Sequence, residues 1–238
     1  MIEQFKPLVP NPNTLTIENQ VPAKLGDLNR LVDDINTGTV PLPETAVSGN
    51  VLVYNGTEWV AGNSAEFTYE IGEYVPSEGG VIFHRYLEAG VENYLVVPIV
   101  DESTNQNWSN VTNTLIGVSA QSTWDGLSNS DAIVAQIGHL SSAASLCLNS
   151  TTGGQNDWYL PSTDELGLLW QSRFHVNKSF SAIGGATLIG ISGTQTSYWT
   201  SMENNPTTAI TFNFSTSGTD LSSKANTFSV RAVRAFTI

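Results

Sequence analysis

The sequence of 238 residues contains a single cysteine, Cys147, so no disulfide can form within the chain. Charged residues make up only 13% of the sequence, and nine Lys and Arg accompany 22 Asp and Glu, which gives a net charge of −13. Such an acidic chain lacks the basic surface that binds phosphate backbones or anionic membranes. We therefore expect no nucleic-acid and no membrane partner, and a domain held together by packing alone.

Targeting features are missing as well. No apolar run approaches the roughly 20 residues that a membrane-spanning helix needs. The first residues, MIEQFKPLVPNPN, have neither the basic region nor the apolar core of a signal peptide. A composition rich in Ser, Thr, Asn and Gly is common in extracellular β-rich proteins, and without an export signal it fits a virion protein that is made in the host cytoplasm and leaves the cell by lysis. An ordinary cytosolic protein is the alternative.

Catalytic and metal-binding motifs are also absent. His84, His139 and His175 lie in separate segments, and the sequence contains no HExxH, CxxC or GxSxG motif. The adjacent acidic residues Asp164 and Glu165 are explained by helix capping. We expect no enzymatic activity, no cofactor and no bound metal.

The stretch DWYLPSTDEL, residues 157–166, predicts the centre of the fold. Ser162 and Glu165 have the spacing of a capping box, and the apolar residues after them predict a short amphipathic helix over residues 163–174. The bulky residues before Pro161 predict an aromatic core. The tryptophans assigned to this core are Trp158, Trp170 and Trp199.

A second helix is predicted over residues 130–148, although Gly138 weakens it by about 1 kcal/mol relative to Ala. Its apolar stripe, at 4-3-4-3 spacing, consists of Ile133, Ile137, Leu140, Ala144 and Cys147. Strands are expected at residues 81–83, 94–100, 195–201, 207–214 and 227–236, and a long polar loop is expected over residues 101–127.

The last expected strand contains Arg231 and Arg234, which stand out in so acidic a chain. Residues three apart in a strand point to opposite faces. One of the two is therefore expected to pair with a carboxylate such as Glu203, and the other to face solvent or a neighbouring subunit.

The N-terminal region differs in composition from the rest. Prolines predict an extended arm over residues 1–20. Residues 21–62 predict a short helix followed by a hairpin with a turn at Asn55 and Gly56. The helix has a heptad-like stripe consisting of Leu25, Leu28, Val32 and Ile35. This stripe fits a bundle of identical helices, favoured here as a homotrimer, or a helix that packs on its own domain.

Several motifs resemble one known family. DWYLPSTDEL, YWTSME (residues 198–203) and VRAVRAF (residues 230–236) resemble the C-type-lectin-like domain family of bacterial collagen-like adhesins and phage fibre proteins. The segment SNSDAIVAQIGHLSSAASLCLNS is similar to the family's first helix, and EGGVIFHRYLEAGVENYLVVPIVDESTNQNW to its opening hairpin and the loop after it. VLVYNGTEWV resembles a spacer of phage fibre and tail proteins. The resemblance implies an α+β fold with two helices against antiparallel sheets over residues 63–238.

Members of this fold that bind sugar through calcium use Glu-Pro-Asn or Gln-Pro-Asp together with Trp-Asn-Asp. The nearest pieces here, residues 203–206 and 155–157, do not match, so calcium-dependent sugar binding is not expected. Binding is assigned instead to aromatic and amide side chains on polar loops. These residues are Trp108, Trp124, His175, Asn177, Asn204 and Asn205; Trp124 fits a core position equally well.

The combined prediction is a phage fibre or spike protein. Its arm would attach to other virion proteins, its helix would form a homotrimer, and its tip would bind a host-surface glycan or protein without metal. A structural head-fibre or capsid-decoration protein without a specific receptor is the second hypothesis. A bacterial surface adhesin is the third.

Overall fold

The computed structural model describes residues 50–54, 59–63, 67–190 and 196–238. The chain divides into two units, one ending at Glu66 and the other running from Phe67 to Ile238, and each is treated by itself. In the first unit, β1 (Asn50–Tyr54) and β2 (Trp59–Asn63) pair antiparallel, which confirms the predicted hairpin. The arm and the stripe Leu25, Leu28, Val32 and Ile35 lie outside the described residues.

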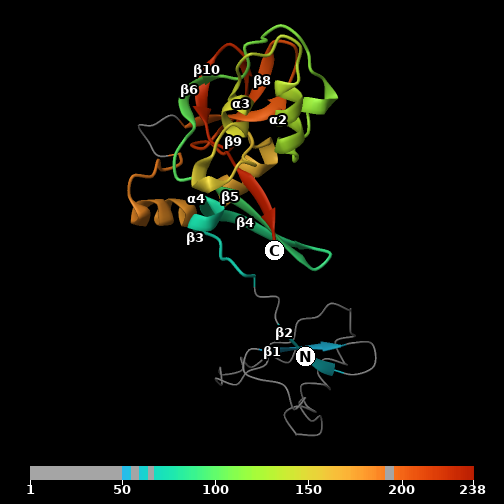
Figure 1. Cartoon of the computed structure of the whole chain (residues 1–238), viewed down its shortest axis with the longest axis vertical. Coiled ribbons are helices and arrows are strands. Elements are labelled where there is room, and N and C mark those ends of the chain that lie inside the picture. Colours follow the sequence, from blue (N-terminus) through green and yellow to red (C-terminus); the bar gives the residue numbers. More distant parts are fainter. Residues whose placement is uncertain (1–49, 55–58, 64–66, 191–195) are drawn as a thin grey trace, which may run out of the picture. The chain divides into compact units, whose positions relative to one another are not determined.

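The second unit is an α+β domain with two sheets (Figure 1). One sheet has the strand order β6-β10-β7-β8-β9 and the other the order β11-β5-β4-β3. The strands are β3 (Tyr74–Val75), β4 (Gly80–Glu88), β5 (Val91–Val97), β6 (Ser103–Asn107), β7 (Ser197–Glu203), β8 (Thr208–Asn213), β9 (Gly218–Ser223), β10 (Thr227–Val230) and β11 (Arg234–Thr237). All pairs are antiparallel except β10 with β7.

Three α-helices pack on these sheets: α2 (Gly126–Val134), α3 (Ala143–Leu148) and α4 (Thr163–Ile183). α2 and α3 contact β7 of the five-stranded sheet, whereas α4 contacts β4 of the other sheet as well as β7 and β8. The apolar core accordingly has two parts, one around Trp108, Trp158 and Trp199 and one around the buried face of α4. None of the helices in the described ranges is both long and apolar enough to cross a membrane.

The predicted organising stretch is confirmed. The Ser162 hydroxyl accepts a hydrogen bond from Glu165 N, and the Glu165 carboxylate accepts one from Ser162 N at 2.7 Å, so the capping box is complete. Trp158 is fully buried. α4 continues to Ile183, beyond the predicted end at residue 174, because Val176 and Phe180 extend its buried face.

The single helix predicted over residues 130–148 is wrong. α2 ends at Val134, Gly138 adopts a positive φ of 85°, and a capping box at Ser142 starts α3. Cys147 is buried as expected, but Ile137 and Leu140 are 96% and 87% exposed. The break turns the middle of the predicted apolar stripe out to solvent.

The predicted last strand is also two strands. VRAVRAF leaves the five-stranded sheet at Val230 and enters the four-stranded sheet at Arg234. Both arginines are buried and paired: Arg231 contacts Asp101 at 2.6 Å, and Arg234 contacts Asp157 and Glu78. The expectation that one of them faces solvent fails because the segment joins the two sheets instead of continuing one. Strands β3, β6 and β9 were not predicted, and β6 lies within the segment 101–127 that was expected to be a loop.

Candidate functional site

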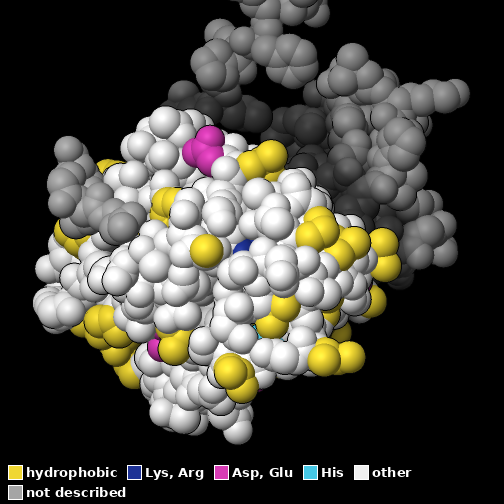
Figure 2. Space-filling model, turned by 90° about the horizontal axis from the view of Figure 1, so that it is seen from above, with side chains coloured by type: hydrophobic (Ala, Val, Ile, Leu, Met, Phe, Trp, Pro, Cys, Tyr) yellow, Lys and Arg dark blue, Asp and Glu magenta, His cyan; other side chains and the backbone are white. Residues whose placement is uncertain are grey.

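One end of the domain is nearly free of charge. This loop end comprises residues 108–142 and the β7–β8 turn at residues 204–207. Its only acidic residues are Asp125 and Asp131, and it contains no Lys or Arg. Figure 2 shows few charged side chains on the face of the domain that is seen from above. The exposed large apolar residues at the loop end are Leu115, Val118, Trp124, Leu127, Ile137 and Leu140.

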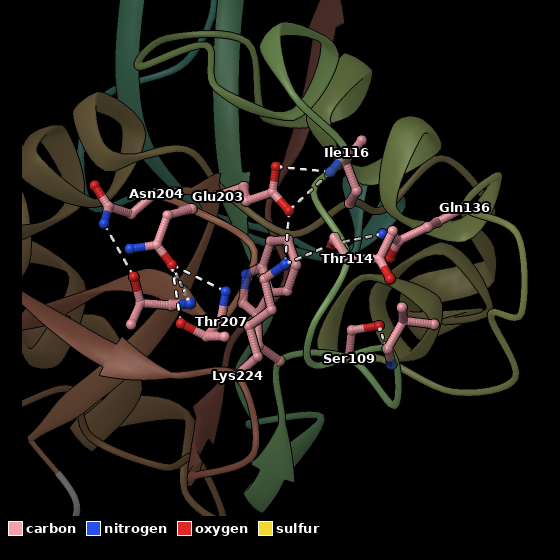
Figure 3. A network of polar contacts seen from close by, with 12 residues as sticks. Ser109, Thr114, Ile116, Gln136, Glu203, Asn204, Thr207 and Lys224 are labelled. Atoms are coloured by element: carbon pink, nitrogen blue, oxygen red, sulfur yellow. Dashed lines mark hydrogen bonds and ion pairs between the residues drawn. The ribbon is translucent and has the colours of Figure 1, made fainter.

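A buried ion pair fixes the loop of this end to the sheet (Figure 3). Lys224 Nζ lies 2.6 Å from Glu203 Oε1, and both side chains are fully buried. The Glu203 carboxylate also accepts hydrogen bonds from the backbone N–H groups of Ile116 and Gly117, at 3.0 and 2.8 Å. Lys224 Nζ donates to the Thr114 carbonyl at 3.3 Å. The ion pair therefore satisfies loop backbone groups, and Glu203 pairs with Lys224, not with an arginine.

Two amide side chains attach the remaining loops, Asn110 at the surface and Asn129 in the interior. Asn110 Oδ1 accepts hydrogen bonds from the backbone of residues 140 and 141, and its Nδ2 donates to the carbonyl of residue 138. Asn129 is buried on α2; it bonds the Ser122 backbone in both directions and donates to Ser201 Oγ. In a chain without disulfides these side chains hold irregular backbone in one conformation.

The structure separates the two tryptophans that were predicted to bind. Trp108 is fully buried, and its Nε1 donates to the Thr200 carbonyl at 2.8 Å. Its placement in a ligand-binding set is therefore wrong, since the ring fills the core and lies 5.0 Å from Lys224 Nζ. Trp124 precedes α2 and is 71% exposed. It is the tryptophan of this set that can contact a partner.

Asn204 and Asn205 shape the β7–β8 turn. Asn205 Oδ1 accepts hydrogen bonds from the backbone N–H groups of Thr207 and Thr208, each at 2.9 Å. Asn204 is exposed, and its Nδ2 donates to Thr208 Oγ1. Hydrogen bonds within the turn therefore fix the positions of both amide groups.

His175 and Asn177 lie elsewhere. Both are on α4, not on a polar loop, because that helix is longer than predicted. Asn177 bonds the backbone of Ile189 through both Oδ1 and Nδ2, so its amide fixes the segment after the helix. Trp124, Asn204 and Asn205 thus belong to the loop end, and the other two do not.

One contact resembles a catalytic pair but serves capping. His139 Nε2 lies 2.9 Å from the Ser142 hydroxyl. That hydroxyl is buried and accepts the Ser145 N–H as the N-cap of α3. Burial lowers the pKa of His139, and no described carboxylate contacts its ring. Within the described ranges no three His, Cys, Asp or Glu side chains converge to hold a metal ion.

Sequence reasoning missed the Glu203–Lys224 pair. A signal was present, because Lys224 is the only Lys or Arg between Lys178 and Arg231. An isolated cation among uncharged residues indicates a specific carboxylate partner. The partner itself lies 21 residues away, and only the fold brings it close.

One comparison with known proteins gives a match. The family model described as the Lcl C-terminal domain matches residues 98–234, more than half of the chain. The matched range contains the whole five-stranded sheet and all three α-helices. It confirms the predicted C-type-lectin-like fold. Among curated proteins none matches significantly.

Proposed function

We propose a function from one premise: this chain belongs to the Lcl C-terminal domain family, and it carries a lectin-like domain of the adhesin or fibre type. In the proposal the chain is a phage fibre or spike protein. Its C-type-lectin-like tip binds a glycan or protein on the host surface. The role is binding, with no metal and no catalysis.

The observation that carries the proposal is the loop end, which is nearly free of charge and is fixed by buried hydrogen bonds. Trp124 and Leu115 are exposed there, and the Glu203–Lys224 pair binds the backbone on both sides of Leu115. Irregular loops on a rigid scaffold are where binding residues concentrate. A fixed aromatic ring adds contact area at little cost in conformational entropy, which favours recognition of an uncharged surface.

The N-terminal region completes the proposal. Residues 1–20 would attach to other virion proteins, and the stripe Leu25, Leu28, Val32 and Ile35 would form a homotrimer. Three linked tips raise the effective affinity for a cell surface without any new contact in each site.

A binding experiment on bacterial cells tests the tip. The labelled full-length chain is incubated with a panel of bacterial strains, with and without EDTA. Trp124→Ala should weaken binding, whereas Phe174→Ala, a matched exposed aromatic on α4, should not. EDTA should have no effect. Loss of binding on chelation would reveal a metal site, and a chain that binds no strain would favour the decoration hypothesis.

Two further measurements test the assembly. Immunogold labelling of phage particles should decorate them at a fibre or spike, whereas labelling of bacterial surfaces alone would favour the adhesin hypothesis. Sedimentation of the full-length chain should give three times the chain mass. Leu28→Asp with Val32→Asp should reduce it to a monomer, and a monomeric unmodified chain at micromolar concentration would overturn the trimer.

A further inference from the structure

A groove lies between the N-terminal half of α4 and strands β7, β8 and β9 of the five-stranded sheet. Its volume is about 630 Å³. We call the lining residues on α4 the wall and those on β7 and β8 the floor; Thr123 and Thr219 complete the lining. β9, which carries Thr219, is the edge strand of the sheet. Trp124, 71% exposed, directly follows Thr123 in the chain.

The floor of the groove is apolar. It is formed by Met202, Ile210 and Phe212, and the last two are only 9% and 6% exposed. Leu221 on β9 pairs directly with Ile210 and is 63% exposed, so the apolar surface continues to the sheet edge. Such an apolar floor can pack against the C–H face of a ligand, and this packing does not require one particular ligand shape.

The α4 wall carries the polar side chains Asp164 and Gln171, with the apolar Leu168 between them. Asp164, Leu168 and Gln171 are spaced at i, i+4 and i+7, and they share one face over about 10 Å of helix. Asp164 and Gln171 are exposed. Within the part of the chain that the structure describes, neither of these two side chains forms a hydrogen bond. A carboxylate and an amide thus remain available beside the apolar floor.

Gly167 keeps this wall open. A glycine inside a helix costs about 1 kcal/mol relative to Ala. Packing does not require it, since a Cβ at this position would meet no atom within 4 Å. Gly167 lines the groove, so any larger side chain would occupy the space between wall and floor. The glycine therefore leaves the space between wall and floor free.

The chemistry of the groove selects the ligand. Carboxylate and amide oxygens accept hydrogen bonds from hydroxyl groups, and an amide also donates. Among the described residues that line the groove, Asp164 is the only charged one, so an anionic ligand is repelled and a cationic one finds a single carboxylate. We propose that this groove binds a neutral oligosaccharide, with sugar C–H faces on Ile210 and Phe212 and sugar hydroxyls on Asp164 and Gln171. This proposal rests on the proposed function, because it names the receptor class of the tip.

The test uses the full-length chain on an array of neutral hexose and N-acetylhexosamine oligosaccharides, with sialylated and sulfated counterparts. Gly167→Trp fills the groove and should weaken binding of neutral glycans by roughly tenfold or more. Gly167→Ala, which adds one methyl group, should keep most of the binding and raise the melting temperature. Ala182→Trp adds the same bulk to an exposed part of α4 outside the groove and should bind like the unmodified chain.

Three results would overturn the proposal: no binding to any neutral glycan, equal binding by Gly167→Trp, or preference for sialylated or sulfated glycans. Melting temperatures of all variants show that they are folded. Binding to bacterial cells is measured in parallel. If Gly167→Trp still binds bacterial cells, the groove is rejected as the binding site and the proposed function stands. Glycan binding through the groove without binding to any bacterial cell keeps the groove and rejects the proposed function.

Discussion

Lys224 is a buried cation beneath the loop end, and Arg231 is a buried cation at the seam between the two sheets, but the two bind different numbers of chain segments. At the seam, the Arg231 guanidinium donates to Asp101 at 2.6 Å, to the Pro98 carbonyl at 2.7 Å and to the Thr187 carbonyl at 2.8 Å. At the loop end, Lys224 bonds one carboxylate and, more distantly, one carbonyl. A planar guanidinium with five donors suits a junction of several segments, whereas an ammonium suits the fixing of one loop.

This difference predicts that the seam governs global stability. Arg231→Met should lower the free energy of unfolding by about 3–5 kcal/mol, because it leaves the buried Asp101 carboxylate without its partner. Urea unfolding measures the change. Arg231→Met combined with Asp101→Leu should recover part of the loss, since no charge is then left unpaired. A loss below about 1 kcal/mol in the single variant would show that the seam is not a stabilising junction.

The loop end should separate stability from binding. Trp108→Ala should cost about 3–5 kcal/mol by opening a cavity beneath the loop. Trp124→Ala should change stability by less than about 0.5 kcal/mol, because that ring is exposed. Thermal unfolding of both variants checks this contrast. Equal melting temperatures for the two variants would contradict the burial of Trp108.

Local rules explain which parts of the fold the sequence predicted. The capping box at Ser162 and the hairpin around residues 50–63 depend on neighbours within a few positions, and both are confirmed. The family motifs correctly indicated the fold, and the match over residues 98–234 confirms it. Trp158 was correctly assigned to the core because it belongs to a bulky apolar run directly before a capped amphipathic helix.

Long-range pairing explains what the sequence could not predict. Residues 230–236 form two strands because Arg234 pairs with Val96 of the four-stranded sheet. That partner lies far away in the sequence. The exposure of Trp108 could not be inferred from a polar neighbourhood, since its environment is made by Thr200 and Lys224. The groove was missed for the same reason: its wall and floor come from segments some 40 residues apart.

The start of α4 gives a smaller expected effect. Its backbone reaches the loop end, because Asp164 N donates to the Thr123 carbonyl at 2.9 Å. Ser162→Ala should cost about 1 kcal/mol, the usual loss for an N-cap. Ser162→Thr, which keeps a hydroxyl, should cost less. Urea unfolding decides this, and a loss as large as that of Trp108→Ala would mean that the cap also fixes the loop end.

The smallest effect expected is a pH dependence near the seam. Burial raises the pKa of the Glu102 carboxyl above its ordinary value, and the hydrogen bond from Ser150 Oγ and the charge of Arg231 only partly oppose this. Between the unfolded pKa of about 4.3 and the raised folded pKa, the folded state holds more protons. The contribution of Glu102 to stability is therefore complete at low pH and is lost as the pH rises through the folded pKa. The free energy of unfolding should fall less between about pH 4 and pH 7 in Glu102→Gln, because a glutamine binds no proton in either state. Glu88→Gln, at an exposed position, controls for the lost charge. An unchanged pH profile in Glu102→Gln would show that this carboxyl has the same pKa in the folded and unfolded states.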